Sequence, residues 1–256
     1  MIPSPIHRVL SVTTTHGVAS LLMGGQACIL YGAAEFSRDV DLAIVADSEN
    51  LSRLSNALEE LEAAVTDVPP FEARYLERGH AVHFRCGRDD VRGLRIDVMA
   101  RMRGVDAFPA LWARRTTLSL PAEADQPLQV DLLALPDLVA AKKTQRDKDW
   151  PMIRRLVEAN YFGARAQPTP ERVAFWLREL RTPELLVECA SAFPDEARVA
   201  AERRPAVERA AQGDPDRVEQ ELHAEQLRER AADRAFWAPL RVELEALRHG
   251  PRAGEP

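Results

Sequence analysis

Residues 18–45 read VASLLMGGQACILYGAAEFSRDVDLAIV, and this stretch decides the fold. The apolar run Val18–Met23 stops at the pair Gly24-Gly25, which is typical of a buried strand that ends in a tight turn. Residues 26–31 have helical character. Residues 39–45 begin with the alternation of polar and apolar residues that a strand shows. The stretch therefore predicts a strand, a turn, a short helix and a second strand.

Further strands and helices follow along the chain. Ser48 is placed as the N-cap of a helix, because leucines at helical spacing come after it. Residues 81–86 and 94–99 are predicted to be two strands joined by a polar turn. Residues 132–145 and 150–161 are predicted to be helices. Together these elements predict an α/β (α+β) fold with a mixed sheet flanked by helices.

Beyond residue 167 the chain becomes rich in Ala, Arg and Glu and is predicted to be helical. The start signal Thr169-Pro170-Glu171 opens an amphipathic helix. Phe175 and Trp176 of this helix are expected in its core rather than on a base-stacking surface. Three segments are predicted: an α/β domain at residues 1–120, a helical extension at 121–166 and a helical C-terminal region at 167–256. The tail from His249 to Pro256 is predicted to be loose.

The composition excludes several classes of protein. Hydrophobic residues make up 46% and charged residues 29% of the chain, which is typical of a globular protein. The net charge of −6 argues against a broad electrostatic grip on nucleic acid. Three widely spaced cysteines fit a reducing compartment, and neither a signal peptide nor a membrane span is predicted. We therefore expect a cytoplasmic protein that does not bind a membrane.

Three aspartates form the strongest candidate site. Asp39 and Asp41 are two residues apart on a strand and therefore project from one face, about 6.5–7 Å apart at their backbones. Asp97 lies in the apolar strand Leu94–Met99, where an unpaired carboxylate is costly. Neighbouring carboxylates repel each other unless a cation lies between them. Mg²⁺, with Mn²⁺ as the alternative ion, suits such oxygen ligands, so all three aspartates are predicted to bind metal and to be catalytic.

A plainer interpretation of these motifs also exists. An Asp-x-Asp pair alone is more often a solvated turn or a helix cap than a metal site. The apolar surroundings of Asp97 and the glycine pair upstream favour the metal site here. Gly24 and Gly25 would let a phosphate approach the backbone N–H groups closely. His80 and His83 are predicted to be packed or surface residues rather than ligands.

The run Met23-Gly24-Gly25-Gln26-Ala27 … Tyr31-Gly32 … Ser37-Arg38-Asp39-Val40-Asp41-Leu42 resembles the signature of the DNA polymerase β-like nucleotidyltransferase superfamily. Within it, residues 135–142 and 146–149 resemble an element of the branch that holds the bacterial AbiEii/MenT-type toxins and uncharacterised nucleotidyltransferases. The resemblance covers about residues 18–160. It implies that residues 1–120 form a nucleotidyltransferase domain. It also implies that Gly24 and Gly25 contact phosphate, and that Asp39, Asp41 and Asp97 bind metal.

The resemblance further implies that four basic residues bind the nucleotide: Arg38, Lys142, Lys143 and Arg146. The choice between Lys142 and Lys143 stays open, because the spacing to Arg146 is one residue shorter than the family pattern. Gly25 stands where many members have serine, so no hydroxyl contact to phosphate is expected there. Without the family, the basic cluster around residue 142 reads as a solvated helix end.

The activity implied by the resemblance is transfer of a nucleoside monophosphate from an NTP to an acceptor, with release of pyrophosphate. The acceptor stays open among tRNA or another RNA, a protein side chain and a small molecule. A local patch of arginines, at positions 101, 103, 114 and 115, would serve an RNA acceptor. A toxin role in a toxin–antitoxin pair is an analogy to part of the branch. The alternatives are a catalytically silent nucleotide-binding or protein-interaction module, and a helical region 167–256 that binds a protein partner.

Overall fold

The computed structural model describes residues 4–34, 36–121 and 127–249. Its described residues divide into two compact units. The first unit is drawn from residues 1–30, 35–141 and 235–256, and the second from residues 31–34 and 142–234. The boundary at residues 141/142 lies inside the segment 121–166 that the sequence sets apart. Residues 250–256 of the predicted loose tail lie outside the described residues.

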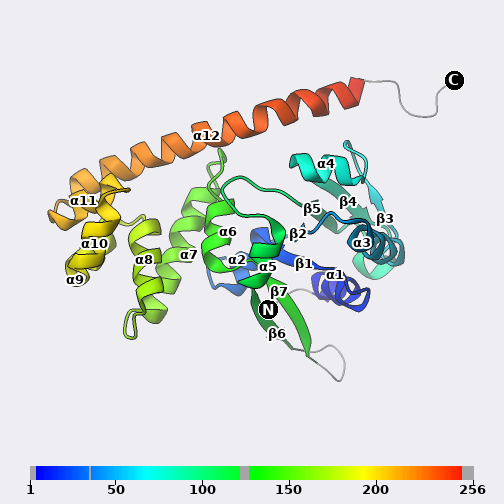
Figure 1. Ribbon diagram of the computed structural model, residues 1–256. Helices are drawn as coiled ribbons and strands as arrows, with labels where there is room; N and C mark the ends of the chain where they lie inside the picture. The colour runs from blue at the N-terminus through cyan, green and yellow to red at the C-terminus, as the bar shows by residue number, and fades with distance from the viewer. Residues whose placement is uncertain (1–3, 35, 122–126, 250–256) are drawn as a thin grey trace. The chain divides into compact units, whose positions relative to one another are not determined.

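A seven-stranded mixed sheet forms the first unit, in the order β3-β4-β5-β2-β1-β7-β6 (Figure 1). The strands are β1 (Ser20–Met23), β2 (Asp39–Ile44), β3 (Ala63–Val65), β4 (Val82–Cys86), β5 (Arg95–Met99), β6 (Thr116–Leu120) and β7 (Leu128–Leu132). The pairs β2–β5 and β1–β7 are parallel, and the other neighbours are antiparallel. The predicted α/β fold with a mixed sheet is confirmed.

The helices of the first unit differ from the sequence prediction in three places. They are α1 (Ser4–Thr15), α2 (Gly24–Leu30), α3 (Ser48–Glu60), α4 (Ala73–Arg78), the short 3-10 helix η1 (Asp89–Val91), α5 (Phe108–Ala113) and α6 (Leu135–Ala141). The glycine pair begins α2 instead of forming a separate turn. The N-cap of α3 is Asp47, whose side chain accepts from the Asn50 N–H, so the prediction of Ser48 is wrong by one residue. The helix predicted over 132–145 is shorter, because Leu132 belongs to β7.

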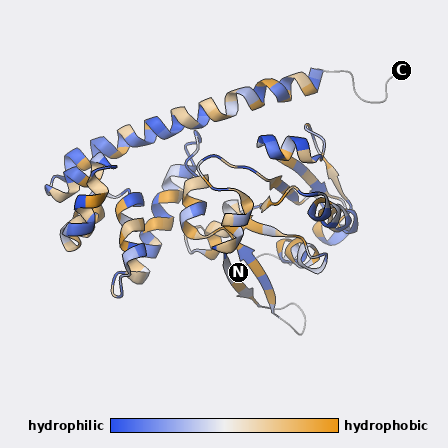
Figure 2. Cartoon of the chain, viewed as in Figure 1, coloured by the Kyte–Doolittle hydropathy of each residue, from blue (hydrophilic) through white to orange (hydrophobic). Residues whose placement is uncertain are grey.

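The strands β6 and β7 were not predicted from the sequence. Hydrophobic and hydrophilic residues alternate along both strands (Figure 2), which is typical of a sheet with one buried face. Their partner is β1, through a parallel pairing of Leu22 with Leu132. This pairing joins segments 110 residues apart in the sequence, so local patterns do not reveal it.

Asn50 ties helix α3 to the centre of the sheet. It is buried, and its side chain accepts from the Ala19 N–H at 2.7 Å. Its amide donates to the carbonyls of Ala19 at 3.1 Å and Val45 at 2.9 Å. These three bonds satisfy backbone groups just before β1 and just after β2, where the sheet ladder ends. Buried backbone groups need such partners. Asn50 therefore links the backbone just before β1 to the backbone just after β2.

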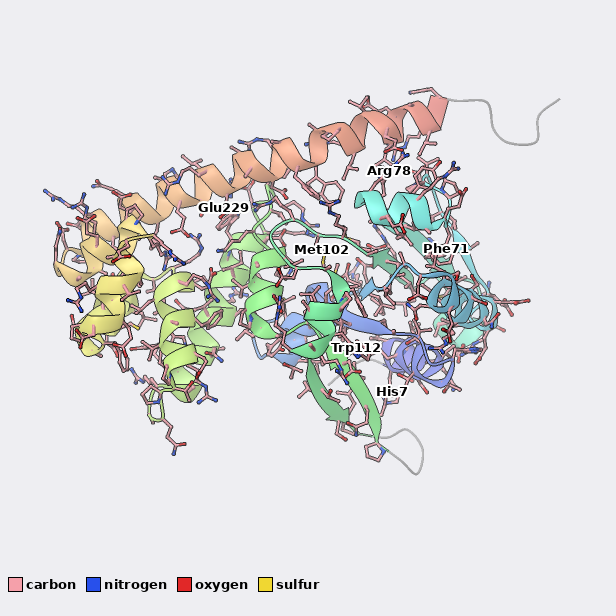
Figure 3. All side chains as sticks on the ribbon, viewed as in Figure 1. His7, Phe71, Arg78, Met102, Trp112 and Glu229 are labelled. Carbon is pink, nitrogen blue, oxygen red and sulfur yellow. The ribbon has the colours of Figure 1, made fainter. Side chains whose placement is uncertain are left out.

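The last part of α12 (Pro215–His249) belongs to the first unit and packs beside α4. Arg78, labelled in Figure 3, forms an ion pair with Glu243. His80 is fully buried, and its Nε2 lies 2.9 Å from a Glu243 oxygen. The backbone at Gly79 lies against Phe236 and Leu240 of α12. The C-terminal helix is therefore anchored to the sheet unit by both apolar and charged contacts.

The second unit is helical, and prolines begin its later helices. Its helices are α7 (Asp149–Ala164), α8 (Pro170–Glu179), α9 (Pro183–Ala192), α10 (Pro194–Ala201), α11 (Pro205–Ala211) and the first part of α12. Five helices in succession start at a proline, where the missing N–H costs nothing and the fixed φ suits the first turn. Among the described residues, no helix is both long and apolar enough to cross a membrane.

Trp176 forms the centre of the second unit. It is fully buried, and its indole N–H donates to the Asn160 side chain at 2.8 Å. Its ring meets Tyr161 edge to face, with the centroids 5.1 Å apart. Phe175 is also buried. The predicted core role of both aromatic residues is confirmed.

Replacing Asn50 with Ala should lower the free energy of unfolding by about 3 kcal/mol, because three buried backbone groups lose their partner. Urea denaturation measures this change. Asn56 lies on the exposed face of the same helix, so Asn56→Ala should stay within about 0.5 kcal/mol of the parent. Equal losses in the two variants would contradict the role given to Asn50.

Candidate functional site

The three predicted aspartates lie on one face of two adjacent strands. Strands β2 and β5 run parallel, and Asp41 pairs in register with Asp97. Neighbouring strands are about 4.8 Å apart. Val40 and Ile96, which alternate with the aspartates, are fully buried on the opposite face. Asp39, Asp41 and Asp97 are therefore brought together, with Asp39 one pleat repeat from Asp41.

Asp97 is held by two neighbouring side chains. Its Oδ1 accepts from the Arg95 Nε at 2.6 Å and lies 2.8 Å from His83 Nδ1. His83 faces Asp97 in the antiparallel pairing of β4 with β5. Burial by itself would raise the pKa of Asp97, but the hydrogen bonds with His83 and Arg95 outweigh it and keep that pKa below its ordinary value. Asp97 is therefore a carboxylate at neutral pH.

Arg95 provides a positive charge beside the acidic cluster. It stands opposite Asp39 in the β2–β5 register. The hydrogen bond to Asp97 raises the pKa of Arg95, and the charges of Asp39 and Asp41 add to this effect. One guanidinium thus offsets part of the repulsion among three carboxylates.

The donor chemistry of the cluster fits a divalent cation such as Mg²⁺ or Mn²⁺, since all three side chains offer carboxylate oxygens. Within the described ranges, no group of three or more His, Cys, Asp or Glu residues has the arrangement of a metal site. Oδ1 of Asp97 is engaged by Arg95 and His83. A cation bound by all three aspartates would therefore compete with Arg95 and His83 for Oδ1 or use Oδ2 of Asp97.

The glycine pair contacts the segment that carries the aspartates. Gly24 has a φ of +64°, and a Cβ placed on it would lie 1.8 Å from Oδ2 of Asp41. A Cβ on Gly25 would lie 2.4 Å from Oγ of Ser37. The Gln26 side chain, which is buried, donates to the Ser37 carbonyl at 3.0 Å. The two halves of the sequence motif therefore meet directly, and only glycine fits at the point of contact.

The predicted nucleotide-binding cations come from both units. Arg38 stacks on the ring of Phe36, with 5.4 Å between its Cζ and the ring centroid. Lys142, Lys143 and Arg146 belong to the second unit. Their contact with a triphosphate stays a prediction.

Each basic residue of that cluster has a carboxylate partner inside the second unit. Lys142 lies 3.5 Å and Arg146 2.8 Å from Asp149. Lys143 lies 2.8 Å from Glu179. Both lysine side chains are largely buried. The two lysines therefore stabilise packing around α7 and α8 instead of extending into water, whereas Arg146 is exposed and pairs with a residue three positions away.

The arginine patch that the sequence offers for RNA is partly neutralised. Arg114 donates to Asp137 at 2.7 and 2.8 Å. These hydrogen bonds raise the pKa of Arg114. Arg115 pairs with Asp131 at 3.0 Å and stacks on Trp112 at 4.1 Å. These two arginines are therefore engaged in contacts within the protein.

No model of a known protein family matches the chain, and no curated protein matches it. The resemblance of the glycine and aspartate motifs to a superfamily therefore stays a prediction.

Two residues of the site were missed by the sequence analysis. Arg95 lies two positions before Asp97, so strand alternation alone places both on one face. His83 was expected to be a packed or surface residue, yet it is a partner of Asp97. The signal for His83 is weaker, because it depends on the register between β4 and β5.

Replacing Gly24 with Ala should destabilise the protein more than Gly17→Ala. Both glycines have φ near +65°, but an added Cβ meets nothing within 4 Å at Gly17. Left-handed backbone alone costs an alanine about 1–2 kcal/mol. At Gly24 the Cβ of Asp41 would also lie only 2.7 Å away, so rotation of the Asp41 carboxylate does not remove the overlap.

We expect the free energy of unfolding of Gly24→Ala to be lower than that of Gly17→Ala by about 2 kcal/mol, the cost of overpacking. Urea denaturation of the two variants gives this difference directly. Equal stabilities would show that Gly24 does not need to lie against Asp41.

Proposed function

We propose that this chain is a nucleotidyltransferase that moves a nucleoside monophosphate from an NTP to an acceptor and releases pyrophosphate. The observation that carries the proposal is the register of Asp41 with Asp97 on adjacent parallel strands, with Gly24 packed against the Asp41 carboxylate. The sequence motifs and this geometry converge on the same residues. The polymerase β-like assignment rests on the motifs.

In this proposal, Asp39, Asp41 and Asp97 hold the divalent cation. When bound, Mg²⁺ or Mn²⁺ neutralises the triphosphate and lowers the pKa of the attacking hydroxyl. The lowered pKa of Asp97 keeps it ionised, which suits it to bind a cation. Gly24 and Gly25 leave the backbone open to a phosphate, because neither carries a side chain.

The chemistry is an in-line substitution at the α-phosphorus. A bond forms between the acceptor oxygen and that phosphorus, and the bond from phosphorus to the pyrophosphate oxygen breaks. The hydroxyl proton passes to a base, for which Asp97 is our candidate. The acceptor class stays open among RNA, including tRNA, a protein side chain and a small molecule. A toxin-type role is one biological setting for such an activity.

One observation favours a second function, a catalytically silent nucleotide-binding or interaction module on the same fold. Arg95 already offsets the acidic cluster and engages Oδ1 of Asp97. A protein that uses this guanidinium as a permanent counter-ion has no need of a metal ion. The two functions differ in whether the cluster binds a divalent cation at all.

Replacing Asp41 with Asn should reduce nucleotide transfer by about 10²–10³-fold, since a lost ligand weakens charge stabilisation in the transition state by several kcal/mol. The assay incubates the protein, Mg²⁺ and α-labelled NTPs with cell extract, then follows the labelled acceptor and pyrophosphate. Asp131→Asn is the matched control, because Asp131 is a half-buried aspartate on β7, away from the cluster. Undiminished transfer by Asp41→Asn would refute the proposed site.

Replacing Arg95 with Met should strengthen Mg²⁺ binding by about tenfold or more, because a positive charge beside the carboxylates is removed. Isothermal titration measures the Kd of the parent and the variant without any acceptor. Arg92→Met, at a more exposed position with its own partner Asp89, should leave the Kd unchanged. Failure of both the parent and Arg95→Met to bind Mg²⁺ would favour the silent module.

A further inference from the structure

A cavity of about 640 Å³ lies within the second unit. Sites for small organic ligands commonly measure about 300–1,000 Å³ and are mostly apolar. The apolar part of this lining comes from α8, α10 and the start of α11: Ala174, Leu177, Val199, Ala200 and Pro205. Val199 is 62% exposed, which is unusual for a residue with so apolar a side chain. The cavity therefore offers an apolar surface that the second unit itself does not cover.

The largely buried charged groups Arg204 and Glu225 of the cavity lining are paired. Arg204 is buried and donates to Glu225 at 2.9 Å and to the backbone carbonyls of Leu177 at 2.7 Å and Leu180 at 2.8 Å. Arg181 donates to the other Glu225 oxygen at 2.7 Å. Burial would raise the pKa of Glu225, but the two arginines outweigh it and lower that pKa. These groups are preorganised and need no ligand to neutralise them.

The charges at the rim are different. Arg203 and Arg228 line the cavity and are exposed. Neither has an ion pair or a side-chain hydrogen bond with any residue that the structure describes. In total, five basic and three acidic side chains line the cavity, including Glu229 of α12 (Figure 3). The lining is therefore positive, although the whole chain carries a net charge of −6.

We infer that this cavity binds a small organic anion with an apolar body. The body lies against Leu177 and Val199, and the carboxylate, sulfonate or phosphate group pairs with Arg203 and Arg228. Two unpaired guanidinium groups recognise an anion by charge-assisted hydrogen bonds. The apolar wall provides surface for the body of the ligand beside these charges. The inference concerns the second unit alone and does not rest on the proposed transferase activity.

The test uses two fluorescent probes on the full chain. The anionic probe is 1-anilinonaphthalene-8-sulfonate, and the neutral probe is N-phenyl-1-naphthylamine, which has the same rings without the sulfonate. We expect one molecule of the anionic probe to bind per chain, at least tenfold more tightly than the neutral probe. Equal affinities for the two probes, or binding without saturation, would overturn the inference.

Charge-reversal variants test whether the probe binds in the cavity. In the double variant Arg203→Glu with Arg228→Glu, both rim charges are reversed. We expect the Kd of the anionic probe to rise at least tenfold and the Kd of the neutral probe to change by less than twofold. The matched control is Arg155→Glu with Arg234→Glu, which makes the same charge change at exposed arginines that do not line the cavity. An equal loss in this control would show general electrostatic attraction instead of a site.

A filling variant tests the apolar wall separately. Ala174 is exposed on α8 and lines the cavity, so Ala174→Trp should abolish binding of both probes without disturbing the core. Ala232→Trp, at an exposed position on α12 outside the lining, should bind both probes as the parent does. Unchanged binding by Ala174→Trp would refute the location. Binding of an acidic peptide but of neither probe would overturn the inference in favour of a protein partner.

Discussion

The candidate site depends on the parallel pairing of β2 with β5. This register sets Asp41 beside Asp97, and like charges at such a distance oppose folding unless other groups offset them. Arg95 and His83 provide that compensation, since both contact Oδ1 of Asp97. The contacts that offset the repulsion between Asp41 and Asp97 therefore also keep Asp97 charged. A carboxylate maintained in this state at neutral pH is suited to bind a cation.

Backbone features on either side support this pairing. Gly24 allows the start of α2 to lie against Asp41, where any side chain would overlap. Asn50 fastens the backbone before β1 and after β2 through one buried amide. Local geometry, packing and electrostatics thus act on the same two strands. The part of the sheet that carries the acidic residues is also the part with the most specific constraints.

The second unit uses charge in another way. Its prolines start successive helices, and buried ion pairs join the segments between helices to neighbouring helices. Lys143 with Glu179 and Arg204 with Glu225 are such pairs. Breaking one of these pairs leaves a buried charge unpaired, which is costly. Lys142 and Lys143, in the segment between α6 and α7, therefore have a structural role in the described chain. Arg203 and Arg228, which line the cavity, differ from these residues because neither has an ion pair with a described residue.

The sequence by itself determined the fold class, the main strands and the helical C-terminal region. It also indicated which three aspartates form the candidate site. These follow from local signals: period-two alternation, helical spacing, proline and glycine positions, and the cost of a carboxylate in an apolar strand. Only the tertiary structure decided the partners. The role of His83 depends on the register between β4 and β5, and the β1–β7 pairing joins distant segments. The pairing of Lys142 and Lys143 with Asp149 and Glu179 depends on how the segment after α6 packs against α7 and α8. Apart from the two strands joined by the turn before residue 94, local patterns do not indicate which strand lies beside which, because the pairing free energy is set by contacts between residues far apart in the chain.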